Sequence, residues 1–317
     1  MHDVICLMGP TGSGKTDLAI DLLAHLPGEI ISVDSAMLYE DFNIGAAKPT
    51  AEVLSKAPHY LVDVTSPLTP YSAAQFCQDA TALCDEIIER GHVPLLVGGS
   101  MMYFRALQQG LAPLPKACAS LRESLKLRLD AEGLPSLYRE LEQVDAVSAS
   151  RLHPHDTQRI LRALEVYHAK GEPLSKLQKQ NPTEGAPYRW INLALFPEDR
   201  AWLHARIEKR FTHMLDAGFL DEVETILKKY GDEVIDTPAM KSVGYRQAVA
   251  YLKGEYDFET FKHKAVVATR NLAKRQLTWL RSWPDIHCVD PAKPECMQAV
   301  LELLSRMLDN EPSKNGE

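Results

Sequence analysis

A glycine-rich segment near the start of the chain has the residue types and the spacing of a phosphate-binding loop. It fits the pattern G-x-x-x-x-G-K-[ST] and reads Gly9-Pro10-Thr11-Gly12-Ser13-Gly14-Lys15-Thr16. In such a loop the backbone N–H groups and the N-terminus of the next helix bind phosphate oxygens. Lys15 adds a mobile positive charge, and the hydroxyl of Thr16 suits a Mg²⁺ ion. The segment predicts that two linked phosphates bind here with a metal. It does not distinguish whether the phosphates belong to ATP, GTP or another molecule.

Two further polar side chains follow predicted strands. Asp34 directly follows the run Ile30–Val33. At this position its carboxylate would suit a general base or a group near a metal. It would also suit a cap for the next turn. Ser100 follows Pro94–Val97 through two glycines, which either admit a ligand to the backbone or form a tight turn. Because ligands of parallel sheets bind at the carboxyl ends of strands, we expect both side chains beside the phosphate loop.

Three stretches carry cations that suit a phosphate or an RNA. One opens a helix with a guanidinium and reads Lys241-Ser242-Val243-Gly244-Tyr245-Arg246. Thr269–Arg281 has the pattern of a basic amphipathic helix, with a cationic face formed by Arg270, Lys274 and Arg281. A third opens another helix and reads Gln158-Arg159-Ile160-Leu161-Arg162. Taken alone, each stretch is also explained by an ordinary helix whose charges face solvent.

Strand and helix patterns alternate around these residues. Strands are predicted at Val4–Met8, Ile30–Val33, Tyr60–Val64, Pro94–Val97 and Trp190–Leu195. Helices are predicted at Lys15–Leu26 and from Ser72 to about Arg90, the latter opened by a capping box at Ser72 and Gln75. This order predicts an α/β fold, namely a P-loop NTPase-like parallel sheet core flanked by helices.

The pattern becomes helical after Pro113 and Pro115. No strand is predicted between residues 120 and 179, whereas Trp190–Leu195 returns to the sheet. We therefore predict a discontinuous catalytic core (1–115 and 188–309), an all-helical insertion domain (116–187) and a flexible tail (310–317). Later helices are predicted at Arg200–Ala217, Leu220–Tyr230, Tyr245–Leu252 and Phe258–Trp283.

The composition is that of a soluble globular protein with ample core. The chain has 317 residues, of which 45% are hydrophobic and 25% charged, and it contains no apolar run long enough to cross a membrane. No signal peptide is expected, and six cysteines without a C-x-x-C pair indicate free thiols in a reducing cytoplasm rather than a zinc site. The net charge of -8 does not suggest a nucleic-acid partner, but local basic patches decide such binding.

Taken together, the motifs resemble the tRNA dimethylallyltransferase (tRNA isopentenyltransferase) family, bacterial type. The matching stretches run in family order over most of the chain: Gly9–Thr16, Val33–Tyr39, Ile44–Pro49, Tyr71–Phe76, Leu95–Tyr103, Asp156–Glu165, Val243–Gln247 and Thr269–Arg281. Two departures are Gly12, where the family often has Ala, and Ser100, where Thr is usual. We expect no C-terminal zinc-finger extension of the kind that eukaryotic relatives carry, which fits the bacterial type.

The resemblance implies a reaction. The family transfers a dimethylallyl group from dimethylallyl diphosphate to N6 of adenine 37, next to the anticodon, and releases diphosphate. It implies that Asp34 is the general base, with Lys15 and Ser100 as further catalytic residues. The loop Gly9–Thr16 and Arg246 would hold the diphosphate, and Mg²⁺ would lie near Thr16 and Ser100. ATP would be neither required nor consumed.

The resemblance also implies partners. The acceptor would be the anticodon stem-loop of a tRNA, held between the core and the insertion, and we expect a cytoplasmic monomer without a membrane contact. The implied tRNA contacts are Asp34, Ser35, Ala36, Met37, Ser100, Arg122, Gln158, Arg159, Ile160, Leu161, Arg162, Lys241, Ser242, Val243, Gly244, Tyr245 and Arg246. Further contacts are expected at Arg270, Lys274, Arg275 and Arg281.

Other functions fit parts of the sequence. A small-molecule kinase would use the same phosphate loop with ATP, and an adenylate isopentenyltransferase would prenylate a free nucleotide. A non-catalytic RNA-binding module would not need an intact phosphate loop. The long helical insertion and the basic segments favour a macromolecular acceptor.

Overall fold

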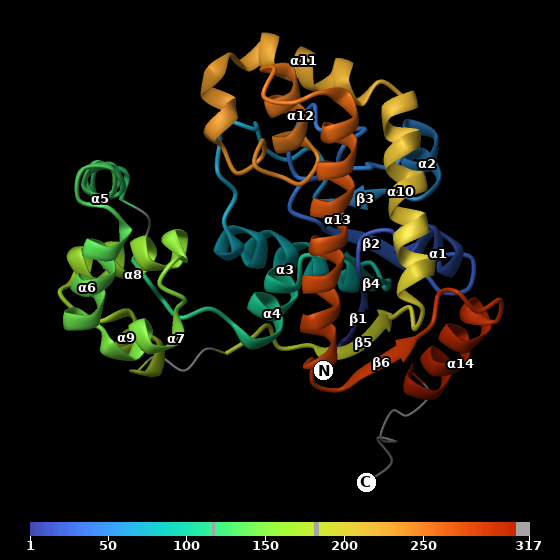
Figure 1. The fold of residues 1–317 in the computed structure, drawn as a ribbon. Helices are drawn as coiled ribbons and strands as arrows, with labels where there is room; N and C mark the ends of the chain where they lie inside the picture. Colours follow the sequence, from blue (N-terminus) through green and yellow to red (C-terminus); the bar gives the residue numbers. More distant parts are fainter. Residues whose placement is uncertain (116–117, 181–183, 309–317) are drawn as a thin grey trace, which may run out of the picture. The chain divides into compact units, whose positions relative to one another are not determined.

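The computed structural model describes residues 1–115, 118–180 and 184–308, so the predicted tail at 310–317 lies outside it. The chain divides into two compact units (Figure 1). One comprises Met1–Gln108 with Ala186–Glu317, and the other comprises Gln109–Gly185. The second unit thus begins before the predicted boundary at 116 and ends before 187.

The first unit is built on a six-stranded sheet in which all neighbouring strands are parallel. The strands lie in the order β3-β2-β4-β1-β5-β6. Their bounds are β1 Asp3–Met8, β2 Gly28–Val33, β3 His59–Tyr60, β4 Val93–Gly98, β5 Arg189–Leu195 and β6 Ile286–Val289. The predicted α/β fold with a P-loop-like parallel sheet is confirmed.

Helices cover both faces of the sheet because successive strand side chains point to opposite faces. Ile5 and Leu7 of β1 pack with α1 (Lys15–Leu22) and α14 (Cys296–Leu308). Cys6 and Met8 belong to the larger core on the other face. The helices that contribute to that core are α3 Ala73–Glu89, α4 Met101–Gln109, α10 Arg200–Asp216, α11 Phe219–Tyr230, α12 Tyr245–Leu252 and α13 Phe258–Arg281.

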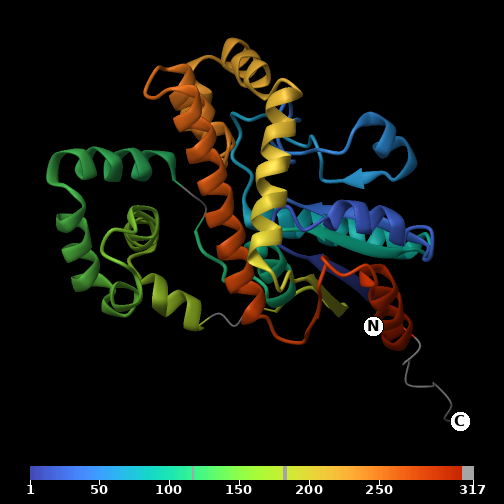
Figure 2. The same cartoon turned by 45° about the vertical axis from the view of Figure 1, so that its right-hand side comes forward.

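Two long helices, α10 and α13, lie side by side above the carboxyl end of the sheet in both ribbon views (Figure 2). Both bring cations to that end of the sheet. Phe211 of α10 and Phe261 of α13 pack edge to face, with ring centroids 5.7 Å apart.

The predicted elements differ from the structure at several points. The strand predicted at Tyr60–Val64 ends at Tyr60, because Leu61 and Asp63 adopt left-handed backbone conformations with φ of 60° and 54°. The first helix ends at Leu22 rather than Leu26. Elements that the pattern did not predict are α4, β6, α14, the short α2 Ala51–Lys56 and the 3-10 helix Asp232–Asp236.

Among its described residues the second unit contains helices joined by loops and no strand. Its helices are α5 Ala119–Glu132, α6 Leu134–Val144, α7 Ala146–Arg151, α8 Thr157–Lys170 and α9 Leu174–Gln180. Leu137 and Leu141 of α6 pack against Ile160 and Leu164 of α8 in a separate small core. This unit therefore has its own hydrophobic centre.

We predict that Gly98→Ala destabilises the first unit severely. A Cβ at Gly98 would lie 2.0 Å from the carbonyl oxygen of Val33, a contact that only a backbone shift relieves. We expect a loss of about 3 kcal/mol in the free energy of unfolding, measured by urea denaturation.

The matched control is Gly91→Ala. Gly91 has φ of +78° but open space around its Cβ position, so the cost should be about 1 kcal/mol, from backbone conformation alone. Equal losses for the two variants would contradict the steric account.

Candidate active site

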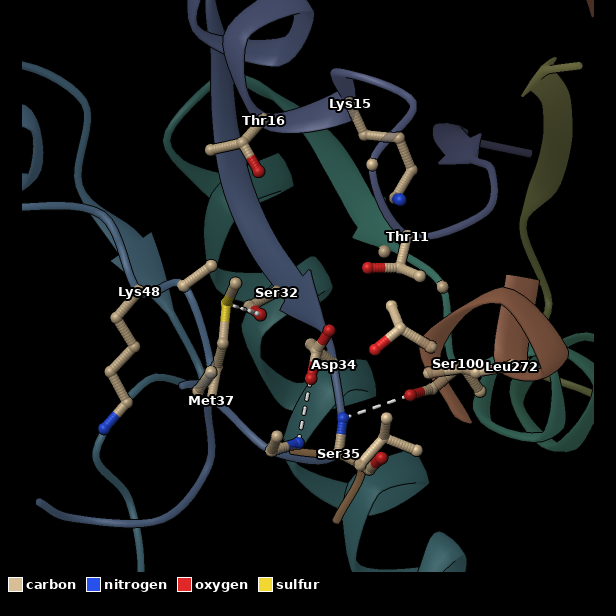
Figure 3. A pocket seen from close by; sticks show the side chains of 18 of the residues that line it. Thr11, Lys15, Thr16, Ser32, Asp34, Ser35, Met37, Lys48, Ser100 and Leu272 are labelled. Atoms are coloured by element: carbon tan, nitrogen blue, oxygen red, sulfur yellow. Dashed lines mark hydrogen bonds between the residues drawn. The ribbon is translucent and has the colours of Figure 1, made fainter. Parts of the chain in front are cut away.

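A cavity of about 800 Å³ lies at the carboxyl ends of β1, β2 and β4. The phosphate loop, Asp34 and Ser100 all contribute to its lining, as the sheet topology predicts. Figure 3 shows Thr11, Lys15 and Thr16 on one side, with Asp34 and Ser100 facing them from the ends of neighbouring strands. The sequence motifs are thus brought into one space.

The phosphate loop leads from β1 into α1 with the geometry of an anion nest. Gly12 and Gly14 adopt φ of +82° and +90°, conformations in which glycine is favoured. Gly14 is the N-cap of α1 and supplies no side-chain cap, so the first N–H groups of the helix are open to a ligand. Gly9, Pro10 and Ser13 are the buried residues of the loop and support its conformation.

Lys15 is the cation at the centre of the loop. Its Nζ donates a hydrogen bond of 2.8 Å to the carbonyl of Pro10. Desolvation lowers the pKa of Lys15 to about 8, although the carboxylate of Asp34 acts in the opposite direction and Arg210 adds to the lowering. Lys15 is therefore a charge that an anionic ligand would stabilise.

Asp34 and Ser100 are linked through the backbone of Ser35 and Ala36. One carboxylate oxygen of Asp34 accepts the Ala36 N–H at 2.8 Å, which is the capping role considered from sequence. Its other oxygen points into the cavity (Figure 3). The hydroxyl of Ser100 accepts the Ser35 N–H at 3.0 Å, and the Ser100 N–H donates to Val33 at 3.1 Å. The ends of β2 and β4 are thereby fixed to each other.

Gln276 of α13 is a site residue that the sequence reasoning missed. Its Oε1 accepts the Thr11 N–H at 2.9 Å, and its Nε2 donates to the carbonyl of Gly99 at 2.9 Å. A Cβ at Gly99 would lie 2.3 Å from that Nε2, so this glycine makes room for a side chain rather than a ligand. Gln276 joins the phosphate loop to the end of β4.

Arg206 and Arg210 of α10 were also missed. Both line the cavity, and Arg206 Nε donates to the carbonyl of Gly12 at 2.8 Å. Desolvation lowers the pKa of Arg210, while the carboxylate of Asp34 raises it. The i, i+4 spacing of two arginines on the helix after β5 was the available signal.

The segment Lys241–Arg246 meets the cavity only in part. Lys241, Ser242, Val243 and Gly244 line it. Tyr245 is fully buried and donates its hydroxyl to Glu222 at 2.6 Å, so its side chain serves the core and not the predicted tRNA contact. Arg246 is exposed on α12 and is not among the lining residues, so its predicted diphosphate contact stays a prediction.

The basic face of α13 is divided. Arg275 lines the cavity, whereas Lys274 is exposed outside its lining. Arg270 pairs with Glu208 of α10 at 3.1 Å, and the guanidinium of Arg281 lies 5.5 Å from the ring centre of Phe196. Ser35, Ala36 and Met37 also line the cavity.

Two of the predicted RNA contacts of the second unit, Arg122 and Arg162, bind a buried carboxylate. Glu165 accepts Arg122 Nε at 3.1 Å and Arg162 Nη1 at 2.8 Å. Gln158 and Arg159 are exposed and Leu161 is half-buried, but Ile160 is fully buried in the core of this unit. The side chain of Ile160 packs in that core, because hydrophobic periodicity places it inward, and its predicted tRNA contact stays a prediction.

The polar groups of the cavity fit a Mg²⁺ ion. Thr16, Asp34 and Ser100 supply oxygen atoms, the donor type that Mg²⁺ prefers. Among the described residues no three His, Cys, Asp or Glu side chains gather as a metal-binding group. In proteins Mg²⁺ is commonly held by one or two carboxylates together with substrate phosphates. The described helices also include none long and apolar enough to span a membrane.

Fold and site together define a phosphate-loop α/β protein with a cation-lined cavity at the carboxyl end of its sheet. A family model for IPP transferases matches residues 37–283. A tRNA dimethylallyltransferase of Legionella pneumophila (strain Corby) is 53% identical over 307 residues, or 97% of each chain. One of Coxiella burnetii (strain Dugway 5J108-111) is 49% identical over 301 residues, or 95% of this chain and 96% of the relative.

Solved structures agree with these relatives. The full-length tRNA isopentenylpyrophosphate transferase from Bacillus halodurans superimposes with a TM-score of 0.70 at 30% identity, covering 98% of this chain and 100% of that one. A eukaryotic dimethylallyltransferase acting on tRNA shares the fold with a TM-score of 0.80 at 23% identity, covering 99% and 81%. The chain belongs to the IPP transferase family and is an enzyme of the bacterial tRNA dimethylallyltransferase type, which confirms the resemblance of its motifs.

We predict that Lys15 makes diphosphate binding pH-dependent. With a pKa of about 8 in the free protein, Lys15 is protonated below that pH and loses its charge above it. The affinity for inorganic diphosphate, measured by calorimetry, should therefore fall above pH 8 by up to about tenfold per pH unit.

The control is Lys15→Met, which removes the charge at every pH. Because diphosphate itself titrates, the informative quantity is the ratio of the wild-type affinity to the Lys15→Met affinity. A ratio that stays constant from pH 6 to pH 10 would contradict the assigned pKa.

Proposed function

We propose that this protein transfers a dimethylallyl group from dimethylallyl diphosphate to N6 of adenine 37 in tRNA. The observation that carries the proposal is the meeting of the phosphate loop, the cations of α10 and α13 and the single strand-end carboxylate Asp34 in one cavity. The names of the relatives at 53% and 49% identity support the same reaction.

The phosphate loop would hold the diphosphate as a leaving group. Departure of diphosphate from an allylic carbon builds negative charge on the leaving oxygens. Lys15, Arg210 and the open N–H groups of α1 are placed to stabilise that charge in a partly desolvated site. Mg²⁺, held near Thr16 and Ser100, would neutralise more of it when bound.

Asp34 would accept the proton that the acceptor amine must lose. In the transfer, N6 forms a bond to the allylic carbon, the carbon–oxygen bond to diphosphate breaks, and the N6 proton passes to the Asp34 carboxylate. The oxygen that points into the cavity is available for this step, since the other one caps Ala36.

The adenine would have to leave its base stack to reach the cavity. Ser35, Ala36 and Met37 extend from Asp34 along the lining, where they would contact the flipped nucleotide. The exposed Arg122, Gln158 and Arg159 of the helical unit would contact the anticodon stem-loop, together with Lys274 and Arg275 of the first unit.

We further propose that the protein works as a cytoplasmic monomer.

The direct test is incubation with labelled dimethylallyl diphosphate, Mg²⁺ and unmodified tRNA. We expect label in the tRNA, no requirement for ATP and loss of transfer when the metal is chelated. Absence of label in the tRNA would refute the proposal. Label in free AMP instead would indicate an adenylate isopentenyltransferase, and ATP-dependent phosphorylation a small-molecule kinase.

We predict that Asp34→Asn separates the two roles of Asp34. An asparagine keeps the oxygen that caps Ala36 but cannot accept the amine proton. Turnover should fall about 10²- to 10⁴-fold, the scale of a lost general base, while tRNA binding in a gel-shift assay persists.

The comparison variant is Asp34→Ala, which also removes the cap. It should show the same loss of turnover and in addition a lower free energy of unfolding, by about 1 kcal/mol. An Asp34→Asn enzyme with wild-type turnover would exclude Asp34 as the base.

A further inference from the structure

One side of the cavity is formed by a short loop, Asp41–Pro49, here called the wall segment. Gly45, Ala46, Ala47, Lys48 and Pro49 contribute to the cavity lining. The segment has no regular secondary structure and closes through a turn in which Ala47 N–H donates to Ile44 at 3.0 Å. The shape of this side of the cavity therefore depends on the contacts that hold the wall segment in place.

The backbone of the wall segment is strained. Asp41 and Ala47 have φ of 66° and 55°, in the left-handed region that non-glycine residues rarely adopt. Each such residue costs about 1–3 kcal/mol and persists only where its surroundings impose it. Strong external contacts must therefore hold this loop.

A single carboxylate makes several of those contacts. Glu222 of α11 accepts the backbone N–H groups of three successive residues, Asn43 at 3.0 Å, Ile44 at 2.6 Å and Gly45 at 3.1 Å. Its Oε1 also accepts the hydroxyl of Tyr245 at 2.6 Å. Both carboxylate oxygens are used, and bonds to an ionised acceptor are about twice as strong as neutral ones.

Close packing surrounds these hydrogen bonds. A Cβ at Gly45 would lie 2.3 Å from the ring of Phe219 and 2.5 Å from the ring of Tyr245. The ring of Phe42 lies 4.4 Å from that of Tyr245, centre to centre. At the outer end, Asp41 accepts Lys229 and the Tyr230 hydroxyl, each at 2.6 Å. Helix α11 thus fixes the segment from Asp41 to Gly45, and Lys48 near its other end pairs with Asp63.

We propose that Glu222 is a positioning residue, which holds the wall segment so that the acceptor and the allylic carbon meet in the correct geometry. The inference rests on the proposed function, since it assigns the wall segment a part in that transfer. Misplacement of reacting atoms by about 1 Å can cost about 10²-fold in rate. The phosphate loop has its own contacts to Gln276 and Arg206, so diphosphate binding should not depend on Glu222.

The test variant is Glu222→Gln, which keeps the size of the side chain. Its amide presents one acceptor oxygen, and its NH₂ group would face a backbone N–H donor. The matched control is Glu224→Gln on the same helix, where the carboxylate pairs with Lys228 at 3.7 Å on the exposed surface. Three quantities are compared: hydrogen exchange of residues 41–49, the Kd of inorganic diphosphate, and kcat/KM with tRNA.

For Glu222→Gln we expect at least about tenfold faster exchange at residues 43–45 and at least about tenfold lower kcat/KM. The Kd of diphosphate should stay within about twofold of the wild type. Glu224→Gln should match the wild type in all three measurements.

Unchanged exchange or unchanged kcat/KM in Glu222→Gln would overturn the proposal. Loss of diphosphate binding together with activity would also overturn it, because Glu222 would then support the fold in general and not the wall segment. Exchange and diphosphate binding need no tRNA, so they separate a failure of this inference from a failure of the proposed reaction.

Discussion

The concentration of positive charge in a partly desolvated cavity is the interaction on which the rest of this structure depends. The lining brings two carboxylates, Asp17 and Asp34, together with the cations Lys15, Arg206, Arg210 and Arg275. Two further lining cations, Lys48 and Lys241, pair with Asp63 and Asp236 outside the lining. Burial works against the charged forms of Lys15 and Arg210, so an anion is needed to stabilise them. The geometry therefore favours a polyanionic ligand before any reaction is considered.

The fold creates this arrangement from distant parts of the chain. Parallel strands place the phosphate loop and Asp34 at one edge, and α10 and α13 bring arginines and Gln276 from more than a hundred residues away. Gln276 bridges two strand ends, and Glu222 fixes the wall segment opposite them. In each of these contacts a helix distant in sequence holds a loop that lines the cavity.

The sequence predicted the local part of the site well. The loop Gly9–Thr16, the strand before it and Asp34 each carry a short-range signal, because turn chemistry and hydrophobic periodicity act over a few residues. The contacts of Gln276 and Glu222 depend on which helices meet at the sheet, and no spacing in the chain encodes that. For Arg210 the i, i+4 spacing with Arg206 was the one local signal. Motifs alone also do not separate buried from exposed positions: Ile160 and Tyr245 belong to motifs that suggest ligand contact, but their side chains pack in cores.

The short elements were missed for a similar reason. Strand β6, Ile286–Val289, has only four residues and is stabilised by its pairing with β5. Its own composition therefore gives little indication of a strand. The strand expected at Tyr60–Val64 stops where Leu61 and Asp63 turn left-handed beside the wall segment. Tertiary contacts decide both cases.

The most direct test of the account is a crystal structure of the protein with Mg²⁺ and a dimethylallyl thiolodiphosphate, which reacts too slowly to be consumed. The account predicts diphosphate oxygens on the N–H groups of the phosphate loop, Lys15 and Arg210, with the allylic carbon facing the free oxygen of Asp34. A diphosphate bound away from Lys15, or an allyl group directed away from Asp34, would contradict it.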